Sequence, residues 1–207
     1  MKRRQYLKSM TLFATGILSG NFLRYALPTQ KQNCFIAIGS LSFNCFSYFW
    51  EQQVRGQYVL IADQFTIKNE IDDRENLIKI DTSDLLDPAN LKTAHCTLSE
   101  QSDFLNMLNN WDRIILLTHF QSKEEFLIGT ELNTTMRNHN VELEVVHFTP
   151  FNFEGKTKSN WSESFIKNIE ISDLVVNLEK ARKMYPNESF SSFFNKINSS
   201  VLDHLAI

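Results

Sequence analysis

Along this chain, short apolar runs alternate with longer segments in which apolar residues recur with helical spacing. The apolar runs cover residues 34–38, 58–62, 77–80, 113–118, 141–148 and 173–178. Runs of this length fit buried strands, and a helix between successive strands is typical of a parallel sheet. The pattern therefore predicts an α/β fold with a Rossmann-like, doubly wound, mostly parallel sheet and helices on both of its faces.

The segments between the apolar runs carry the helical signals. Helices are predicted over residues 44–54, 100–110, 122–138 and 190–205. A further core-facing helix is marked by the spacing of Trp161, Phe165, Ile166 and Ile169. Asn187 or Ser189 is placed to cap the last helix. Residues 68–75 and 81–92 are polar and are predicted to be exposed connections.

Size and composition favour one globular domain. The chain has 207 residues, of which 43% are hydrophobic and 22% charged, so residues 33–207 suffice for a single α/β domain that follows an N-terminal extension, 1–32. A net charge of -3 gives no general electrostatic reason to bind nucleic acid, and none is expected as a partner. Cys34, Cys45 and Cys96 form no metal-like or even-numbered framework, which predicts buried free thiols.

The N-terminus carries a separate signal. Its first residues, MKRRQYLK, include the paired Arg3 and Arg4 and resemble a twin-arginine export signal. The apolar run that follows, residues 10–18, is too short to span a bilayer, and no clean cleavage site follows it. The alternative is a basic helix over residues 1–25 that contacts a membrane surface. The expected location is the cytoplasm or the inner membrane, and the periplasm if the signal functions.

The stretch TPFNFEGKTK, residues 149–158, follows the fifth apolar run and is the most specific motif in the chain. It resembles the ribose-binding loop of FtsZ, the bacterial relative of tubulin. The resemblance implies that Glu154 meets the sugar hydroxyls and that Lys158 approaches the nucleoside. The alternative for both residues is a solvated helix start, where an acidic side chain is favourable.

Other positions extend the resemblance. Asn177 follows the sixth apolar run near the place where the family has an asparagine close to the base. In the last helix, Phe194 matches an aromatic residue that stacks on guanine, and its alternative role is plain core packing. Ser199 stands where the family has an aspartate that binds the guanine edge. A serine cannot supply that charge-assisted pair of hydrogen bonds, so we expect guanine selectivity to fall.

The phosphate-binding part of the FtsZ-like pattern is weak. Family members hold phosphates with glycine-rich loops, because glycine lets backbone amides approach the oxygens. The first loop keeps Gly39 and Asn44, but its bulky Leu41 and Phe43 would crowd a triphosphate. The second loop has the sequence KEEF at residues 123–126, where two acidic groups would repel a polyanion. We therefore expect no bound cofactor, and the alternative is binding of GTP or GDP.

No catalytic or metal site is predicted. The sequence shows no nucleophile elbow, and the adjacent His95 and Cys96 alone cannot build a tetrahedral metal site. The resemblance implies that hydrolysis needs acidic residues from a loop after the central helix. The sequence ends at Ile207, at the end of that helix, so lost GTPase chemistry is expected.

The resemblance therefore predicts a degenerate FtsZ-like domain, a pseudo-GTPase, that acts through protein contact. Its expected partner is a second copy or an FtsZ-like filament, with a link to cell division or filament assembly. The first alternative is a residual binder of GTP, GDP or a nucleoside. The second alternative is an α/β binding domain exported by the twin-arginine system.

Overall fold

The computed structural model describes residues 33–69, 77–85, 108, 110–138 and 141–207. Within them, one sheet contains β1 (Asn33–Ile38), β2 (Gln57–Ala62), β3 (Leu77–Asp81), β4 (Arg113–Thr118), β5 (Glu142–Thr149) and β6 (Leu174–Asn177). The strand order is β3-β2-β1-β4-β5-β6, and every neighbouring pair is parallel. The predicted Rossmann-like sheet is confirmed, and each strand begins and ends within one residue of its apolar run.

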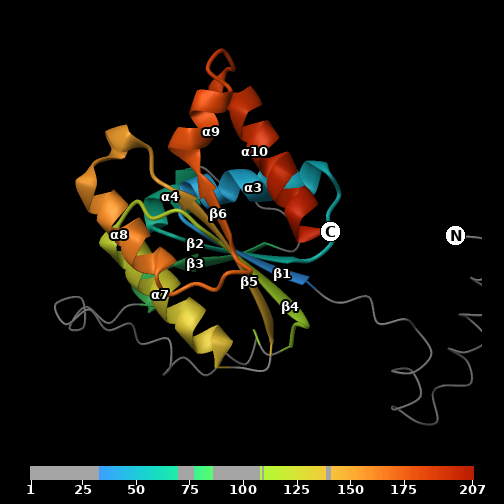
Figure 1. Ribbon diagram of the computed structural model, residues 1–207. Helices are drawn as coiled ribbons and strands as arrows, with labels where there is room; N and C mark the ends of the chain where they lie inside the picture. The colour runs from blue at the N-terminus through green and yellow to red at the C-terminus, as the bar shows by residue number, and fades with distance from the viewer. Residues whose placement is uncertain (1–32, 70–76, 86–107, 109, 139–140) are drawn as a thin grey trace, which may run out of the picture. The chain divides into compact units, whose positions relative to one another are not determined.

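Helices cover both faces of this sheet, as predicted. They are α3 (Ser40–Glu51), α4 (Gln64–Asn69), α5 (Thr82–Leu85), α7 (Lys123–Arg137), the 3-10 turn η4 (Asn152–Glu154), α8 (Lys156–Ile166), α9 (Leu178–Met184) and α10 (Phe190–Leu205). Figure 1 shows α3, α9 and α10 on one side of the sheet and α7 and α8 on the other. The two helical layers therefore bury the central strands from both sides, which explains their uninterrupted apolar sequences.

Each face of the sheet has its own buried cluster. Beneath α7 and α8, strand residues such as Ile36 and Ile38 pack against Leu132 and Phe165. Beneath α3 and α10 the cluster is rich in aromatic residues and includes Phe35, Phe46, Phe49, Tyr58 and Phe193. Full burial of each large side chain contributes about 1.5–3 kcal/mol. Many of the phenylalanines that the structure describes thus serve packing, while a smaller group lines the pocket described below.

Three predicted segments differ from the structure or lie partly outside the described residues. The predicted helix over 100–110 lies outside the described residues except for Leu108 and Asn110. Helix α8 ends at Ile166, so Ile169 lies beyond it, although its side chain still packs against the core. The segment 81–92 is not simply an exposed connection, because α5 begins at Thr82 and Leu85 is buried. The remainder of that segment is outside the described residues.

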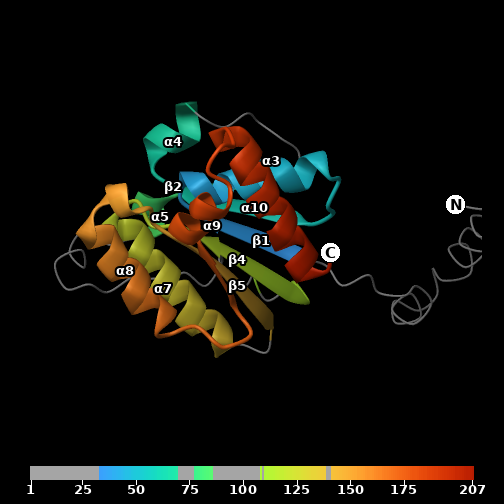
Figure 2. The same ribbon diagram turned by 45° about the horizontal axis from the view of Figure 1, so that its top comes forward.

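Helices α3 and α10 lie side by side, as Figures 1 and 2 both show. Their contact contains a buried polar pair, in which Cys45 Sγ donates to Asn198 Oδ1 over 2.8 Å. Ser189 is the N-cap of α10, since its hydroxyl accepts a hydrogen bond from the Ser192 amide. The far end of α10 is fixed by Arg113, whose Nη2 donates to the Leu205 carbonyl over 2.8 Å. This helix is therefore held at both ends.

The sheet changes winding direction between β1 and β4, and that point positions the candidate site. Strands before it extend the sheet toward β3, while strands after it extend the sheet toward β6. Ile38 and Thr118 are register partners, so the next residues, Gly39 and His119, emerge together at the carboxyl edge. In doubly wound sheets this crevice is the usual ligand-binding position.

Some predictions concern residues that the structure does not describe. The possible export signal or membrane-surface helix in residues 1–32 belongs to this group, as do Cys96 and the His95–Cys96 pair. None of the described helices is long and apolar enough to cross a membrane. Cys34 and Cys45 are buried free thiols, as predicted, and burial raises the pKa of both well above the usual value.

Candidate functional site

A pocket of about 590 Å³ opens at the carboxyl edge of the sheet, between the loops that follow β1, β4 and β5 and the start of α10. It is lined by Ser40, Leu41, Phe43, Asn44, Ser47, His119, Gln121, Phe151, Phe153, Glu154, Phe190 and Phe194. This volume is within the range of small-molecule sites. The pocket combines aromatic walls with a polar floor, and none of these lining residues is lysine or arginine.

The aromatic walls come from three separate elements. Phe151 and Phe153, around η4, stack with ring centroids 5.1 Å apart. Phe190 and Phe194 are one turn apart on α10, with centroids at 5.9 Å. Phe43 adds a ring from α3. Phe151 is buried, but Phe153 is 76% exposed and Phe190 is 52% exposed, so the rings near the opening contact solvent.

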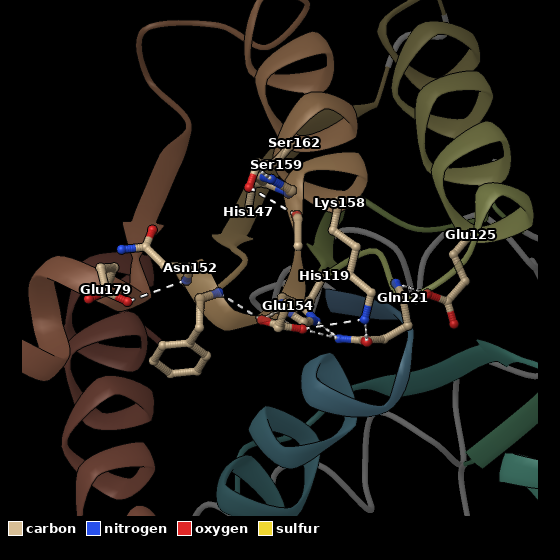
Figure 3. Close-up of polar contacts among 12 residues, drawn as sticks. His119, Gln121, Glu125, His147, Asn152, Glu154, Lys158, Ser159, Ser162 and Glu179 are labelled. Carbon is tan, nitrogen blue, oxygen red and sulfur yellow. Dashed lines mark hydrogen bonds and ion pairs between the residues drawn. The ribbon is translucent and has the colours of Figure 1, made fainter.

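The polar floor is a network centred on Glu154 (Figure 3). Glu154 Oε2 accepts a hydrogen bond from the Phe151 amide over 2.7 Å, which caps the η4 turn. Its Oε1 accepts from Gln121 Nε2 over 2.9 Å and lies 3.6 Å from Lys158 Nζ. Lys158 also donates to Gln121 Oε1. The loops after β4 and β5 are therefore joined by a connected set of polar side chains.

This network fixes the tautomer of His119. Lys158 donates to the Gln121 oxygen, so the Gln121 nitrogen must be the donor toward His119 Nδ1, at 2.7 Å. A ring whose Nδ1 accepts a hydrogen bond carries its proton on Nε2. That Nε2 lies 3.4 Å from Glu154 Oε2 but makes no hydrogen bond, although His119 is buried. This nitrogen is therefore turned toward the Glu154 carboxylate and is itself buried.

Glu154 is strongly acidic in this setting. Partial burial acts to raise its pKa, but His119, Gln121 and the Phe151 amide act against it and lower the pKa to about 2. The carboxylate is ionised at neutral pH and can accept hydrogen bonds but cannot donate them. A ligand that approaches this floor must therefore bring a donor, such as a hydroxyl or an amine.

A second carboxylate, Glu125, occupies the space between the loops after β1 and β4. Ser122 caps α7 by accepting from the Glu125 amide, and the Glu125 side chain turns back so that Oε2 accepts from the Gln121 amide over 2.6 Å. Figure 3 shows Glu125 on the far side of Gln121 from Glu154. Burial raises the pKa of Glu125 to about 7, a shift that the Gln121 and Ser122 amides partly oppose. We call this region, formed by Gly39, His119, Gln121 and Glu125, the cradle.

Gly39 is packed tightly against the cradle. Its φ of 86° lies in the left-handed region that favours glycine. A methyl group added there would lie 2.5 Å from the His119 carbonyl oxygen and 3.1 Å from Glu125 Oε2. The loops after β1 and β4 therefore leave no room for a side chain at position 39.

Of the six residues predicted to bind a nucleotide, the pocket brings three together. Asn44, Glu154 and Phe194 all line it, although they come from α3, η4 and α10. Lys158 does not line the pocket but binds Glu154 and Gln121 behind its floor. The contacts of these four residues with a nucleotide stay predictions.

The other two predicted residues lie elsewhere. Asn177 caps α9, and its Oδ1 accepts from the Lys180 amide over 2.8 Å. Ser199 is half-buried on α10 and does not line the pocket. Its neighbour Asn198 faces α3 and is bonded to Cys45. The structure therefore gives Asn177 a structural role in its helix and places Ser199 away from the pocket floor.

Sequence reasoning did not find His119 and Gln121, which are central to the floor. Neither belongs to a recognisable motif, but both directly follow β4 at the point where the sheet changes winding direction. Polar residues at that position are expected to face a ligand crevice. The position of these residues directly after β4 was therefore the available signal, and it could be interpreted only once the order of the strands was known.

A buried histidine network lies next to the pocket but has no access to it. Thr118 Oγ1 is 2.8 Å from His147 Nδ1, and His147 Nε2 is 2.7 Å from Ser162 Oγ. All three are buried, and burial lowers the pKa of His147 to about 3. A serine nucleophile needs substrate access, so this network joins β4, β5 and α8 structurally. The described residues also contain no cluster of acidic, histidine or cysteine side chains suited to a metal ion.

Comparison with known proteins identifies the fold. No protein-family model and no curated protein sequence matches the chain. An empty FtsZ dimer from M. jannaschii superposes with a TM-score of 0.65 and 13% identity, over 87% of this chain and 55% of that one. TubZ of the Clostridium botulinum phage c-st gives 0.58 and 12%, over 83% and 57%.

A third solved structure agrees with these two. GDP-bound CetZ1 from Haloferax volcanii has a TM-score of 0.55 and 14% identity, over 83% of this chain and 58% of that one. The chain thus spans between 55% and 58% of the length of these three structures. Sequence identity this low establishes the fold alone. The described part of the chain has an FtsZ/tubulin-like fold.

Proposed function

We propose that this chain is a non-hydrolysing domain of FtsZ/tubulin-like fold that acts through contact with another protein subunit, in filament assembly or cell division. The observation that carries the proposal is the filled cradle. The carboxylate of Glu125 lies beside Gly39 and accepts a hydrogen bond from the Gln121 amide, so this amide of the loop after β4 is not free to bind a phosphate. GTP turnover requires bound phosphates, whereas association through the outer surface does not.

The exposed phenylalanines support a contact surface near the pocket opening. Phe153 is 76% exposed and Phe190 is 52% exposed, and both rings lie close to that of the buried Phe151. Neighbouring exposed rings favour interfaces, where large aromatic side chains contribute most of the binding energy. The M. jannaschii neighbour is described as an empty FtsZ dimer, which supports a second copy as the partner.

Sedimentation velocity of the full chain over a range of concentrations tests this function. Association should raise the sedimentation coefficient of the parent chain, and Phe153→Ser combined with Phe190→Ser should abolish that rise. Ile171→Ser is the matched control, because Ile171 is a fully exposed apolar residue outside this surface. A chain that stays monomeric and also fails to bind an FtsZ filament in a co-pelleting assay would contradict the proposal.

A second candidate, binding of a nucleoside or residual binding of GDP, is favoured by a specific observation. The pocket gathers Asn44, Glu154 and Phe194 from separate parts of the sequence, and one structural neighbour, CetZ1, is described as GDP-bound. This binding would be compatible with protein contact, since the pocket lies beside the exposed rings. Ligand titration tests this candidate independently of association.

A further inference from the structure

The turn between α9 and α10 combines exposed apolar side chains with positive charge. Met184, at the end of α9, is 65% exposed, and Phe190, at the start of α10, is 52% exposed. Three basic residues, Lys180, Arg182 and Lys183, precede Met184 within four positions. In Figure 1 this turn projects at the top of the picture, away from the sheet. We call these five residues and the turn between them the α9–α10 tip.

The tip has a fixed backbone shape. Arg182 Nη1 donates to the Glu188 carbonyl over 2.8 Å and to the Tyr185 carbonyl over 3.4 Å. The Arg182 guanidinium also lies 5.3 Å from the centroid of the Phe190 ring. The turn is therefore held in place by contacts within the tip itself, and a partner that binds there does not have to order it first.

Two lysines of the tip are available to contact an anionic partner. Lys183 is 74% exposed, and its Nζ lies 3.9 Å from Glu179 Oε1, which makes a weak ion pair at the surface. Lys180 is exposed and forms no ion pair within the part of the chain that the structure describes. Arg182, in contrast, is engaged by the turn. The mobile positive charge of the tip therefore comes from the two lysines.

The rest of the domain has the opposite charge. The chain has 24 acidic and 21 basic residues, and every acidic one lies within residues 33–207. In the same range, no stretch of four residues other than 180–183 contains three basic residues. A basic region on an acidic domain turns that domain toward an anionic partner, because the remaining surface is repelled. The charge distribution thus favours an approach in which the tip makes the first contact.

An anionic lipid surface fits these features better than an acidic protein does. Exposed apolar side chains flanked by lysines enter the boundary between lipid headgroups and acyl chains, while the ammonium groups stay at the phosphates. Aromatic side chains such as Phe190 contribute a large apolar area at such a boundary. A projecting tip would need a concave protein partner of matching shape, whereas a lipid surface adapts to the tip.

We propose that the α9–α10 tip docks on an anionic membrane surface. Met184 and Phe190 enter the interfacial region of the lipids. Lys180 and Lys183 contact the lipid phosphates. Phe190 also lines the pocket, so the membrane contact and the proposed subunit contact lie on adjoining surfaces. The membrane contact goes beyond the proposed function and does not depend on it.

Co-sedimentation of the full chain with phosphatidylcholine vesicles, with and without phosphatidylglycerol, tests this proposal. The parent chain should bind the vesicles that contain phosphatidylglycerol and should leave pure phosphatidylcholine vesicles unbound. Lys180→Gln combined with Lys183→Gln should weaken the binding by about tenfold or more, because each lysine adds attraction near an anionic surface. Arg55→Gln combined with Lys167→Gln is the matched control, since both residues are exposed and lie outside the tip. The control should bind as the parent chain does.

A further variant measures the apolar part of the contact. Met184→Ser should weaken vesicle binding by about fivefold, because it removes apolar area that the lipid surface would cover. Ile171→Ser is the matched control, since Ile171 is a fully exposed apolar residue outside the tip. It should leave vesicle binding unchanged.

Three outcomes would overturn the proposal. The first is a parent chain that does not bind the anionic vesicles. The second is unchanged binding in both tip variants, which would assign the membrane contact to another part of the chain. The third is binding of soluble poly-glutamate as tight as that of the vesicles, which would indicate an acidic protein partner. Sedimentation velocity without vesicles should give the same result for the lysine variant and the parent chain, so failure of membrane docking and failure of subunit contact are distinguishable.

Discussion

The pocket and the cradle lie side by side at the carboxyl edge of the same sheet, yet only the pocket is open. The pocket has a volume of about 590 Å³ and is lined by five phenylalanines from α3, α10 and the segment around η4. In the cradle, the Glu125 carboxylate fills the space between two loops that are already in close contact. The difference teaches that one buried carboxylate can fill the gap between two loops while the neighbouring pocket stays open.

The largest expected effect on stability comes from substituting Gly39, which lies in the tightly packed cradle. Gly155, which lies in an open region, is its matched control. Gly39→Ala should lower the free energy of unfolding by about 3 kcal/mol, because it combines a positive φ with a clash against the His119 carbonyl. Gly155→Ala also has a positive φ, of 98°, but its added methyl would meet no atom within 4 Å. It should cost about 1 kcal/mol. Urea denaturation measures both, and equal costs would contradict the tight packing of the cradle.

The second prediction concerns the pH dependence of stability. The folded-state pKa of Glu125 is raised to about 7, so its contribution to stability is complete below its unfolded-state value and is lost as pH rises through 7. Glu125→Gln should remove this loss, which amounts to about 2–3 kcal/mol between pH 5 and pH 8. The difference between the parent chain and the variant in urea denaturation at each pH isolates Glu125. A constant difference would show that the carboxylate is not buried as described.

The change of stability with pH has the opposite direction for His147, because its folded-state pKa is lowered to about 3. Its contribution is complete above its unfolded-state value near 6.5 and is lost as pH falls from there toward 3. Both the parent chain and Glu125→Gln retain His147, so its effect cancels when the two are compared at the same pH. For this reason the effect of Glu125 is obtained from the difference in free energy of unfolding between the parent chain and Glu125→Gln at each pH, and not from the pH dependence of the parent chain alone.

The third prediction tests the floor of the open pocket. Glu154→Gln should lower the free energy of unfolding by about 1 kcal/mol at neutral pH, because it weakens the bond from the Phe151 amide and the ion pair with Lys158. Glu179→Gln is the control, since Glu179 accepts a long bond of 3.4 Å from the Asn152 amide. Its effect should be close to zero. Similar losses of stability in both variants would show that the contacts of Glu154 contribute no more than the single long bond of Glu179.

The smallest effect on stability is expected at the pocket opening. Phe153→Ser should change the free energy of unfolding by less than about 0.5 kcal/mol, because the side chain is 76% exposed. The same variant should nevertheless weaken association and nucleoside binding. A large loss of stability in thermal denaturation would mean that Phe153 is part of the core and not of a contact surface.

The sequence allowed the fold to be predicted more fully than the site. Buried strands such as β1 and β4 are continuous apolar runs, so the hydrophobic pattern located them within one residue. The FEG motif likewise pointed to Glu154, which lies on the pocket floor. Local sequence was sufficient to predict these features, because the residues that form each pattern are the same residues that form the strand or the turn.

The remaining parts of the site depend on contacts between distant segments. His119 and Gln121 meet Glu154 only because β4 and β5 are neighbours in the sheet. An acidic second loop was predicted to repel phosphate, but the sequence could not show that Glu125 turns back to bind the Gln121 amide. Asn177 was predicted to lie near a base, but it caps α9, a role that the sequence analysis did not consider and that also suits an asparagine.

Gly39 has a consequence for how sequences of this fold are compared. Its backbone conformation and its contact with the His119 carbonyl require a glycine whether or not any phosphate binds. Selection for stability alone would retain this residue long after a nucleotide was lost. A glycine after the first strand is therefore poor evidence of nucleotide binding in such chains, because the packing of the two loops requires it in any case.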